Sequence, residues 1–381
     1  MLGLYVHYPF CLAKCPYCDF YSVGRGDEES RLAVSYFAAL ERELALWLET
    51  NPVLRGRALA SVYFGGGTPS LASSEDIGRF LRVVREAFAL APDAEITLEA
   101  NPGASDCERF EGFRRARVNR LSIGVQSFSP RELQALGRVH SPDEARSALA
   151  AARLAGFANL GADLMFGVPG QTLADFARHL AELLRFRPEH ASIYGMTVYE
   201  DTPFEERQKA GTLPLPSEDE QSEMFLLAHR RMSEAGYLHY EISNYARPGF
   251  ESRHNLLYWN NGDWIGLGPS AHSSLAGERT ENPRSVTEWL RAIESGVLAL
   301  RPEEKPSPQA ALGEAVMLGL RQSCGVSLSK LERRFGPEAA RRAEALFAQA
   351  IDEGFLHAEG DRRALTERGL LLADSIMTRF F

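Results

Sequence analysis

The sequence lacks the features that would place it in a membrane or outside the cell. No stretch of its 381 residues approaches the roughly 18 uncharged apolar residues that a membrane-spanning helix needs. Its N-terminus has no basic segment followed by a long apolar run and a small-residue cleavage site, so it does not resemble a signal peptide. We therefore expect a soluble, cytoplasmic protein.

The chain has few cysteines, and its acidic residues outnumber its basic ones. The five cysteines are an odd number, and three of them crowd into eight residues. Such spacing is a poor disulfide framework but a reasonable set of thiolate ligands in a reducing compartment. The net charge of −9 disfavours attraction to nucleic acid phosphate or anionic lipid, because both depend on clustered Lys and Arg. The composition thus argues against a disulfide scaffold and a nucleic-acid partner.

The first 200 residues alternate between strand-like and helix-like segments. Each of six β-rich segments ends in glycine or a polar cluster, and helical patterns lie between them. The expected strands are Leu4–Tyr8, Ser61–Phe64, Glu95–Glu99, Arg120–Val125, Asn159–Phe166 and His190–Val198, and the expected helices are Ser30–Thr50, Ser73–Leu90, Ser105–Ala116, Ser141–Ala155 and Thr172–Phe186. Because the dinucleotide glycine fingerprint is missing, six such units predict an α/β fold with a partial (β/α)6 TIM-like barrel over residues 1–200.

The repeat ends near residue 200. Residues 201–301 are expected to close the barrel, with a helix over Glu218–Ala235 and a strand over Leu238–Ser243. A linker over Pro302–Pro308 leads into a small, mainly helical domain over 302–381, which has a hairpin at Gly354–Leu365 and a winged-helix-like order of elements. The 11 basic and 12 acidic residues after Pro302 offer no basic face, so we do not expect DNA binding.

Three cysteines follow the first expected strand with the spacing Cys-x3-Cys-x2-Cys. Cys11, Cys15 and Cys18 suit three irons of a [4Fe-4S] cluster, which leaves the fourth iron able to bind an external amine and carboxylate. Zinc is the alternative, but it requires four ligands, so His7 or a distant residue would have to complete the site. The ligand count therefore favours a cluster. The run Gly65–Thr68 after the second strand allows close backbone approach to a ligand.

This cysteine loop resembles the defining motif of the radical S-adenosylmethionine (SAM) superfamily. Members reduce SAM at the cluster and release a 5'-deoxyadenosyl radical. Within it, the chain is most similar to the branch of oxygen-independent coproporphyrinogen III dehydrogenase and the haem chaperones of HemW type. The segments that carry this resemblance run nearly end to end: Tyr5–Cys11, Gly65–Pro69, Glu99–Gly103, Gly124–Phe128, Gly137–His140, Asp163–Gln171 and Gly266–His272.

The resemblance implies two groups of SAM-binding residues. Tyr5, Gly66 and Glu99 would contact the cluster-bound cofactor, with Glu99 accepting from ribose hydroxyls. The dehydrogenase also has a second cofactor pocket. The residues of this chain that match positions lining it are Tyr17, Gly67, Thr68, Gln126, Arg138, Asp163 and Thr197. Each also has a purely structural interpretation, because strand ends carry many polar residues that only support loops.

Two departures from the dehydrogenase favour the haem chaperone branch. The dehydrogenase has a further cysteine two residues beyond the third, where this chain has Phe20, and it has an N-terminal extension, whereas only four residues precede Tyr5 here. In addition, His254-Asn-Leu-Leu-Tyr258-Trp259 resembles the H-N-x-x-Y-W motif that the chaperone branch associates with haem binding. His is a common haem ligand, and Tyr and Trp offer flat surfaces to a porphyrin.

The resemblance implies a haem chaperone that binds haem and delivers it to haem-dependent acceptors, membrane respiratory enzymes among them. Its cofactors would be a [4Fe-4S] cluster and SAM, with an electron donor for the cluster and haem as cargo. The alternatives are a coproporphyrinogen III dehydrogenase, which oxidatively decarboxylates propionates, and a radical SAM methyltransferase acting on a tetrapyrrole. Whether the protein is an enzyme is left open at this stage.

Overall fold

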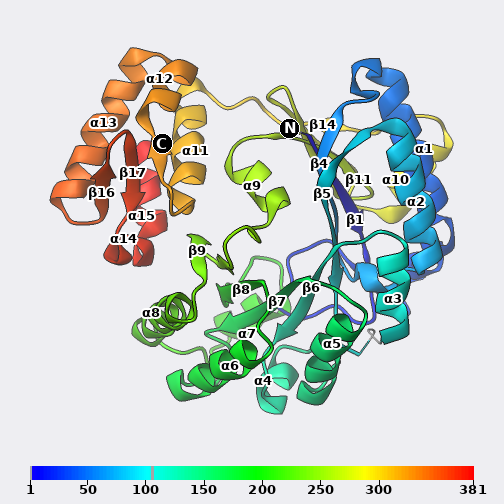
Figure 1. Ribbon diagram of the computed structural model, residues 1–381, viewed down its shortest axis with the longest axis horizontal. Coiled ribbons are helices and arrows are strands. Elements are labelled where there is room, and N and C mark those ends of the chain that lie inside the picture. Colours follow the sequence, from blue (N-terminus) through cyan, green and yellow to red (C-terminus); the bar gives the residue numbers. More distant parts are fainter. Residues whose placement is uncertain (1, 104–106) are drawn as a thin grey trace.

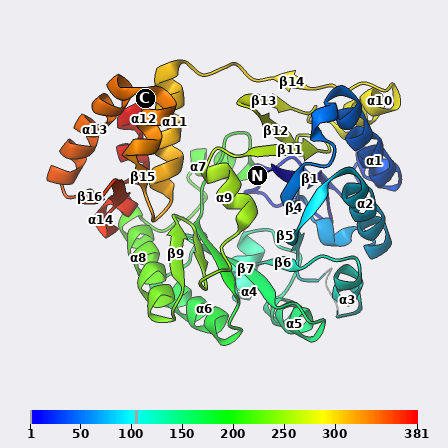
Figure 2. The same ribbon diagram turned by 45° about the horizontal axis from the view of Figure 1, so that its top comes forward.

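The computed structural model describes residues 2–103 and 107–381 of the chain (Figure 1). Within these ranges twelve strands form one sheet in the order β14-β13-β12-β11-β1-β4-β5-β6-β7-β8-β10-β9. The first two residues of the expected helix Ser105–Ala116 lie outside the described residues. Strands and helices alternate along the chain, so the fold is α/β, and the helices pack on the outer face of the sheet (Figure 2).

Six neighbouring parallel strands form the partial barrel, which confirms the expected fold class. They are β1 (Leu2–Tyr8), β4 (Ala58–Gly66), β5 (Ala89–Ala100), β6 (Arg120–Gln126), β7 (Asn159–Phe166) and β8 (His190–Gly195), connected through α1 (Ala33–Thr50), α2 (Ser74–Ala87), α3 (Cys107–Arg115), α4 (Pro130–Ala135), α5 (Pro142–Leu154) and α6 (Leu173–Arg185). Short elements between them are β2 (Phe10–Cys11), β3 (Val23–Gly24), η1 (Glu28–Leu32), η2 (Pro52–Leu54) and η3 (Pro69–Leu71).

The expected helix Ser73–Leu90 is too long. The helix ends at Ala87, and Ala89 and Leu90 already pair with Ala58 and Leu59 of β4. Leu90 therefore belongs to a strand, because pairing with a distant segment outweighs the local helical pattern.

Residues after 200 extend the sheet at both edges. The segments β10 (Asn244–Ala246) and β9 (Leu238–Glu241) add to β8, while β11 (Asp263–Leu267), β12 (His272–Leu275), β13 (Glu278–Glu281) and β14 (Arg301–Pro302) add to β1. Helices α7 (Pro203–Lys209), α8 (Glu218–Glu234), α9 (Arg253–Trp259) and α10 (Val286–Glu294) belong to the same part. The aromatic stretch 254–264 thus forms α9 and the start of β11.

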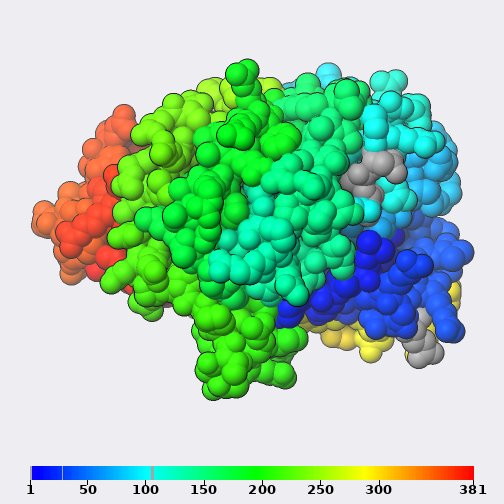
Figure 3. All heavy atoms as spheres, turned by 90° about the horizontal axis from the view of Figure 1, so that it is seen from below, coloured from blue at the N-terminus to red at the C-terminus, as the bar shows by residue number. Residues whose placement is uncertain are grey.

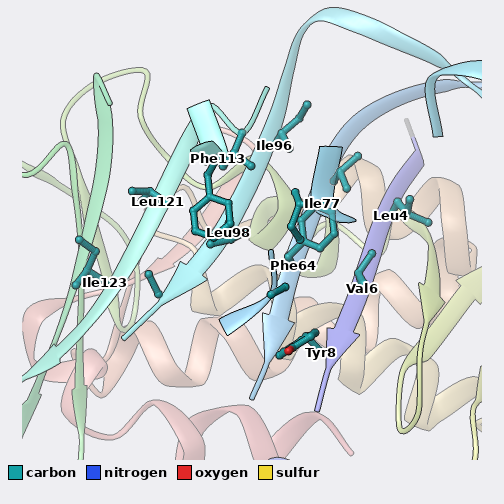
Figure 4. Close-up of a cluster of buried hydrophobic side chains, with 14 of the residues drawn as sticks. Leu4, Val6, Tyr8, Phe64, Ile77, Ile96, Leu98, Phe113, Leu121 and Ile123 are labelled. Carbon is teal, nitrogen blue, oxygen red and sulfur yellow. The ribbon is translucent and has the colours of Figure 1, made fainter. Parts of the chain in front are cut away.

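Side chains alternate between the two faces of the barrel strands. Leu4, Val6, Phe64, Leu98 and Leu121 point outward and are fully or almost fully buried beneath the helices (Figure 4). The residues between them point inward and are largely polar, as at Tyr63, Glu99 and Ser122. The apolar layer therefore holds the helices to the sheet, and the interior is left for chemistry.

The last 74 residues form a second hydrophobic cluster of their own, with Val316, Leu320, Phe347 and Phe380 at its centre. Its elements are α11 (Pro308–Arg321), β15 (Val326–Ser327), α12 (Leu328–Phe335), α13 (Pro337–Asp352), β16 (Leu356–Glu359), β17 (Arg362–Leu365), α14 (Glu367–Leu371), α15 (Ala373–Met377) and η4 (Thr378–Phe380). They lie at one end of the molecule (Figure 3). In the described residues, no helix has both the length and the apolar character needed to span a bilayer.

Candidate functional site

The glycine-rich turn after β4 holds the chain that leads into the cysteines. The N–H of Gly67 donates to the carbonyl of Tyr8 at 2.7 Å, and the N–H of Thr68 donates to that of Phe10 at 2.9 Å. A Cβ atom at Gly67 would lie 2.8 Å from both carbonyl oxygens, closer than any real Cβ contact. Glycine is therefore required at this position to bring the two loops together.

The three thiols are half-buried at the end of β1. The hydroxyl of Thr68 lies 3.5 Å from Cys11 Sγ, and Arg138 Nη1 lies 3.7 Å from Cys15 Sγ. Burial raises the pKa of Cys11, partly offset by the Thr68 hydrogen bond, and raises the pKa of Cys18 to about 11. At neutral pH these two groups are therefore thiols until a metal displaces the proton.

The donor set fits an iron–sulfur cluster better than zinc. His7 is not available as a fourth ligand, because its Nε2 lies 2.9 Å from the carbonyl oxygen of Tyr21 and its Nδ1 lies 3.1 Å from the hydroxyl of Tyr5. In the part of the chain that the structure describes, no three His, Cys, Asp or Glu side chains converge to hold one metal ion. A four-iron cluster needs no such point, since each thiolate binds its own iron.

Tyr5, Tyr63 and Glu99 form one wall of the barrel interior beside the cysteines. Tyr63 donates its hydroxyl to Glu99 Oε1 at 2.7 Å and stacks against the ring of Tyr5, with 6.2 Å between centroids. The backbone of Gly66, at a φ of 103°, also hydrogen-bonds Glu99. Burial raises the pKa of Glu99 to about 7. The carboxylate is therefore held in place by two groups of the neighbouring strand β4 and is suited to accept from hydroxyl groups.

Arg138 connects the cysteine loop to the ends of β5 and β6. Its Nη2 donates to Asn101 Oδ1 at 2.5 Å and to the carbonyl of Gly124 at 3.1 Å, while Asn101 Nδ2 donates to the hydroxyl of Thr68 at 2.9 Å. Burial alone would lower the pKa of Arg138, but the Tyr17 phenol and the Cys15 thiol keep it above its usual value. These groups surround a small hollow lined by Leu12, Ala13, Cys15, Thr68, Asn101, Pro102, Gly137, Arg138 and Val139.

Gln126 and Asp163 lie further into the barrel. Gln126 has a φ of 64°, which turns the chain at the end of β6, and its Oε1 accepts from the hydroxyl of Tyr194 at 2.7 Å. Asp163 accepts from the hydroxyl of Ser122 at 3.1 Å, and burial raises its pKa to about 6. Thr197 stands apart, because it is exposed on the segment after β8. The structure thus brings Gln126 and Asp163 to one interior and leaves Thr197 at its margin.

His254 lies inside the barrel with both ring nitrogens in hydrogen bonds. Its Nδ1 lies 2.8 Å from the hydroxyl of Ser61 and its Nε2 lies 2.7 Å from that of Tyr258. The ring stacks on Tyr63 with 5.1 Å between centroids, and burial lowers its pKa to about 3. His254 is therefore a neutral, buried group that joins α9 to the wall formed by Tyr5, Tyr63 and Glu99.

Trp259 faces away from His254 and Tyr258. The guanidinium of Arg321, at the end of α11, lies 4.5 Å from the centroid of the Trp259 ring. Gln322 donates its Nε2–H to the carbonyl of Trp259 at 3.2 Å. The three aromatic residues of the motif therefore do not share one surface: two face the barrel interior and one faces the C-terminal domain.

Three residues of this site were missed in the sequence, namely Tyr63, Asn101 and Tyr194. Tyr63 stands two positions before Gly65 on β4, so the two lie on the same face of the strand. Asn101 directly follows β5 and lies inside the segment Glu99–Gly103 that carries the resemblance, although no role was assigned to it. The alternation of side chains along a strand could have identified Tyr63. Tyr194 becomes recognisable only through its contact with Gln126.

Comparison with known proteins identifies relatives of this chain and the families that its two parts match. The model of the radical SAM superfamily matches residues 5–183, and the model of the HemN C-terminal domain matches residues 307–372. "Heme chaperone HemW" of Mycobacterium tuberculosis is 37% identical over 98% of this chain and 93% of that protein. "Heme chaperone HemW" of Bacillus subtilis is 33% identical over 100% of this chain and 99% of that protein.

Among solved structures, coproporphyrinogen III oxidase (HemN) from Escherichia coli has the same fold. Its TM-score is 0.84, at 24% identity, over 100% of this chain and 89% of that chain. At that identity the likeness shows the fold alone. The HemW proteins are more than 30% identical to this chain over almost its whole length, so they show the family as well as the fold. The chain belongs to the HemW family of the radical SAM superfamily.

Proposed function

We propose that this protein is a haem chaperone, which binds haem and delivers it to haem-dependent acceptor proteins. The observation that carries the proposal is the identity of 37% and 33% to two proteins named heme chaperone HemW, over almost the full length of all three chains. Phe20 supports it, since the side chain is exposed where the dehydrogenase branch has a cysteine. We further propose that the protein acts in the cytoplasm and that its acceptors include membrane respiratory enzymes.

A [4Fe-4S] cluster and SAM are the proposed resident cofactors. Cys11, Cys15 and Cys18 would hold the cluster, and Tyr5, Gly66 and Glu99 would contact the SAM bound to it. When bound, the pair supplies one-electron chemistry, for which an electron donor is required. Glu99 suits the ribose because the hydroxyl of Tyr63 donates to one of its carboxylate oxygens and so fixes the orientation of the group. Tyr17, Gly67, Thr68, Gln126, Arg138, Asp163 and Thr197 are proposed to line a second pocket.

The proposed haem contacts are His254, Tyr258 and Trp259. His254 is 1% exposed and both of its nitrogens are engaged, so it would bind iron only after Tyr258 releases Nε2. Breaking that buried hydrogen bond costs about 0.5–1.5 kcal/mol, which a metal–nitrogen bond readily offsets.

Radical chemistry on a tetrapyrrole is the second candidate. It is favoured by the gathering of Gln126, Arg138 and Asp163 near the cysteine loop, where they would line a second cofactor pocket. A coproporphyrinogen III dehydrogenase or a tetrapyrrole methyltransferase would use them. This alternative predicts turnover, whereas a carrier predicts stoichiometric binding.

One anaerobic experiment separates the candidates. Protein with reconstituted cluster is incubated with SAM, reductant and coproporphyrinogen III, and separately with haem and an apo-acceptor. A carrier yields one bound haem per chain, transfer to the acceptor and no protoporphyrinogen. Catalytic formation of protoporphyrinogen or of a methylated tetrapyrrole would overturn the carrier proposal.

A further inference from the structure

The segment 126–138 carries two of the residues proposed for the second cofactor pocket, one at each end. Gln126 ends β6, Arg138 follows the short helix α4, and the six residues of α4 lie between them. An isolated helix of that length is not stable in water, because it forms too few hydrogen bonds to offset the cost of its nucleation. The positions of Gln126 and Arg138 therefore depend on what holds α4 to the rest of the barrel.

Glu132, in the first turn of α4, provides this attachment. Its side chain is fully buried, and its Oε2 accepts from the hydroxyl of Ser127 at 2.7 Å and from Nε2 of Gln171 at 2.9 Å. Nε2 of His179 lies 3.0 Å from the same oxygen. Burial raises the pKa of Glu132, but the imidazole of His179 and the other two hydrogen bonds hold it below its usual value. Glu132 is therefore a carboxylate at neutral pH, and since a carboxylate only accepts, His179 donates its Nε2–H.

The three donors come from three different parts of the barrel. Ser127 directly follows β6, Gln171 lies between β7 and α6, and His179 is on α6, which lies beside α4 in Figure 1. One buried carboxylate thus joins α4 to the ends of two barrel strands and to the next helix. Ser127 and Gln171 belong to segments that carry the family resemblance, but neither is among the proposed pocket residues.

Toward the start of the segment, this attachment fixes the turn that places Gln126. Gln126 has a φ of 64°, which is uncommon for a residue with a side chain. The hydroxyl of Ser127, which donates to Glu132, also accepts from the N–H of Ser129 at 3.0 Å. The turn is thus closed directly after Gln126, whose side chain accepts from the hydroxyl of Tyr194.

Toward the end of the segment, α4 places Arg138 against the cysteine loop. The N–H of Arg138 donates to the carbonyl of Leu133, the residue after Glu132, at 2.9 Å. Gly137 has a φ of 66°, and a Cβ atom there would lie 2.5 Å from Cδ of Pro16 in the cysteine loop. Because the packing is this close, a movement of α4 would displace the Arg138 guanidinium from the cysteine loop.

We propose that Glu132 is a positioning residue, whose buried hydrogen bonds set the placement of Gln126 and Arg138 in the second cofactor pocket. The inference rests on the proposed function, because that pocket is part of it. Glu132 acts on cofactor binding only through the two residues at the ends of its segment. Its loss should therefore weaken binding in the second pocket and leave binding at the cluster unchanged.

The test is a calorimetric titration of the full-length protein with SAM after anaerobic reconstitution, with the cluster kept oxidised so that SAM is not cleaved. The wild type should bind two equivalents, one at the cluster and one in the second pocket. Glu132→Ala should bind the first as the wild type does and the second about tenfold or more weaker, the loss typical when the partner that orients a binding group is removed.

The conservative variant Glu132→Gln should restore most of the affinity for the second equivalent. Its amide oxygen can take the place of Oε2 and accept all three hydrogen bonds. Its amide nitrogen falls where Oε1 has no hydrogen-bond partner among the described residues, so no existing bond is broken.

Glu189→Ala is the matched control. The Glu189 carboxylate also accepts three hydrogen bonds, two from Arg153 at 2.7 and 3.0 Å and one from the N–H of Leu160 at 3.0 Å. It lies just before β8, at the opposite end of the barrel from the cysteines. This variant removes a comparable set of bonds and should bind both equivalents as the wild type does.

The outcomes separate this inference from the function on which it rests. Wild-type affinity for the second equivalent in Glu132→Ala would overturn the assignment, and so would loss of both equivalents in that variant or an equal loss in Glu189→Ala. If Glu132→Ala does not fold, Gln171→Ala removes one donor instead, and unchanged binding in it would equally refute the role of the network. A single equivalent in the wild type would overturn the second pocket and this inference together, but it would leave the haem chaperone proposal, which haem transfer tests.

Discussion

Glu95 holds the first turn of α9 from inside the barrel. Its carboxylate oxygens accept the backbone N–H groups of His254 and Arg253 at 3.3 Å each, and Oε2 lies 3.7 Å from Arg120 Nη1. Glu95 is 6% exposed and Arg120 is 2% exposed. Removal of one partner of a buried pair costs about 3–5 kcal/mol, because it leaves an uncompensated charge. We expect Glu95→Gln to lower the free energy of unfolding by that amount.

Thermal unfolding of cluster-free protein measures this loss. At roughly 2 °C for each kcal/mol in a protein of this size, Glu95→Gln should melt about 6–10 °C below the wild type. Hydrogen exchange at the backbone of residues 253–259 should accelerate as well, since the helix loses a charged partner at its N-terminus.

A matched surface variant makes the comparison quantitative. Glu49 forms an ion pair with Arg42 at 3.1 Å, but both side chains are about half exposed, so Glu49→Gln should cost only about 0–1 kcal/mol. The double variant Glu95→Leu/Arg120→Met should recover most of the stability lost by Glu95→Gln. Equal losses in Glu95→Gln and Glu49→Gln would refute the reasoning.

Three further outcomes follow from the site and its surroundings. Cys15→Ser should abolish the cluster absorption near 400 nm after anaerobic reconstitution, whereas Cys324→Ser, outside the cysteine loop, should retain it; an intact cluster in Cys15→Ser would contradict the ligand assignment. Tyr63→Phe should weaken SAM binding roughly tenfold, about 1.4 kcal/mol, because Glu99 loses its orienting donor; calorimetry measures this, and unchanged affinity would count against Glu99 as a SAM contact. Burial raises the pKa of Glu43 to about 7, so its contribution to stability is complete below about pH 4.5 and is lost as the pH rises through 7. The fall in melting temperature between pH 5 and pH 8 should therefore be smaller in Glu43→Gln, and an identical fall would disprove the assignment.

The fold was largely predictable because its signals are local. Strand segments and helical segments alternate along the first 200 residues. The strand segments end in glycine or polar clusters, and several helices begin at Ser or Thr, so both kinds of boundary can be read from the sequence. The capping boxes at Ser141 and Thr172 show this, since each side chain accepts from the backbone N–H three residues on. Leu90 was assigned to the wrong element, because its place is decided by pairing with Leu59.

The chemistry of the site was predictable only in part. Cysteine spacing identifies a thiolate set without any knowledge of the fold, but the exclusion of His7 as a ligand depends on Tyr21 and Tyr5. His254 is the clearest case, because the motif suggests an available imidazole whereas Ser61, 193 residues away in sequence, occupies one of its nitrogens. Sequence pattern identifies residue types, and long-range contacts decide which of their atoms are free.

The pairing of β1 with both β4 and β11 has a consequence for the order of assembly. One neighbour of β1 is about 60 residues away in the chain, while the other begins at Asp263. At about 5–20 residues per second, a ribosome needs on the order of 10–50 s to make the second neighbour after the first strand has emerged. During that interval the strand that leads into Cys11 has one open edge, so the sheet beside the cysteine loop is completed only after Asp263–Leu267 has been made.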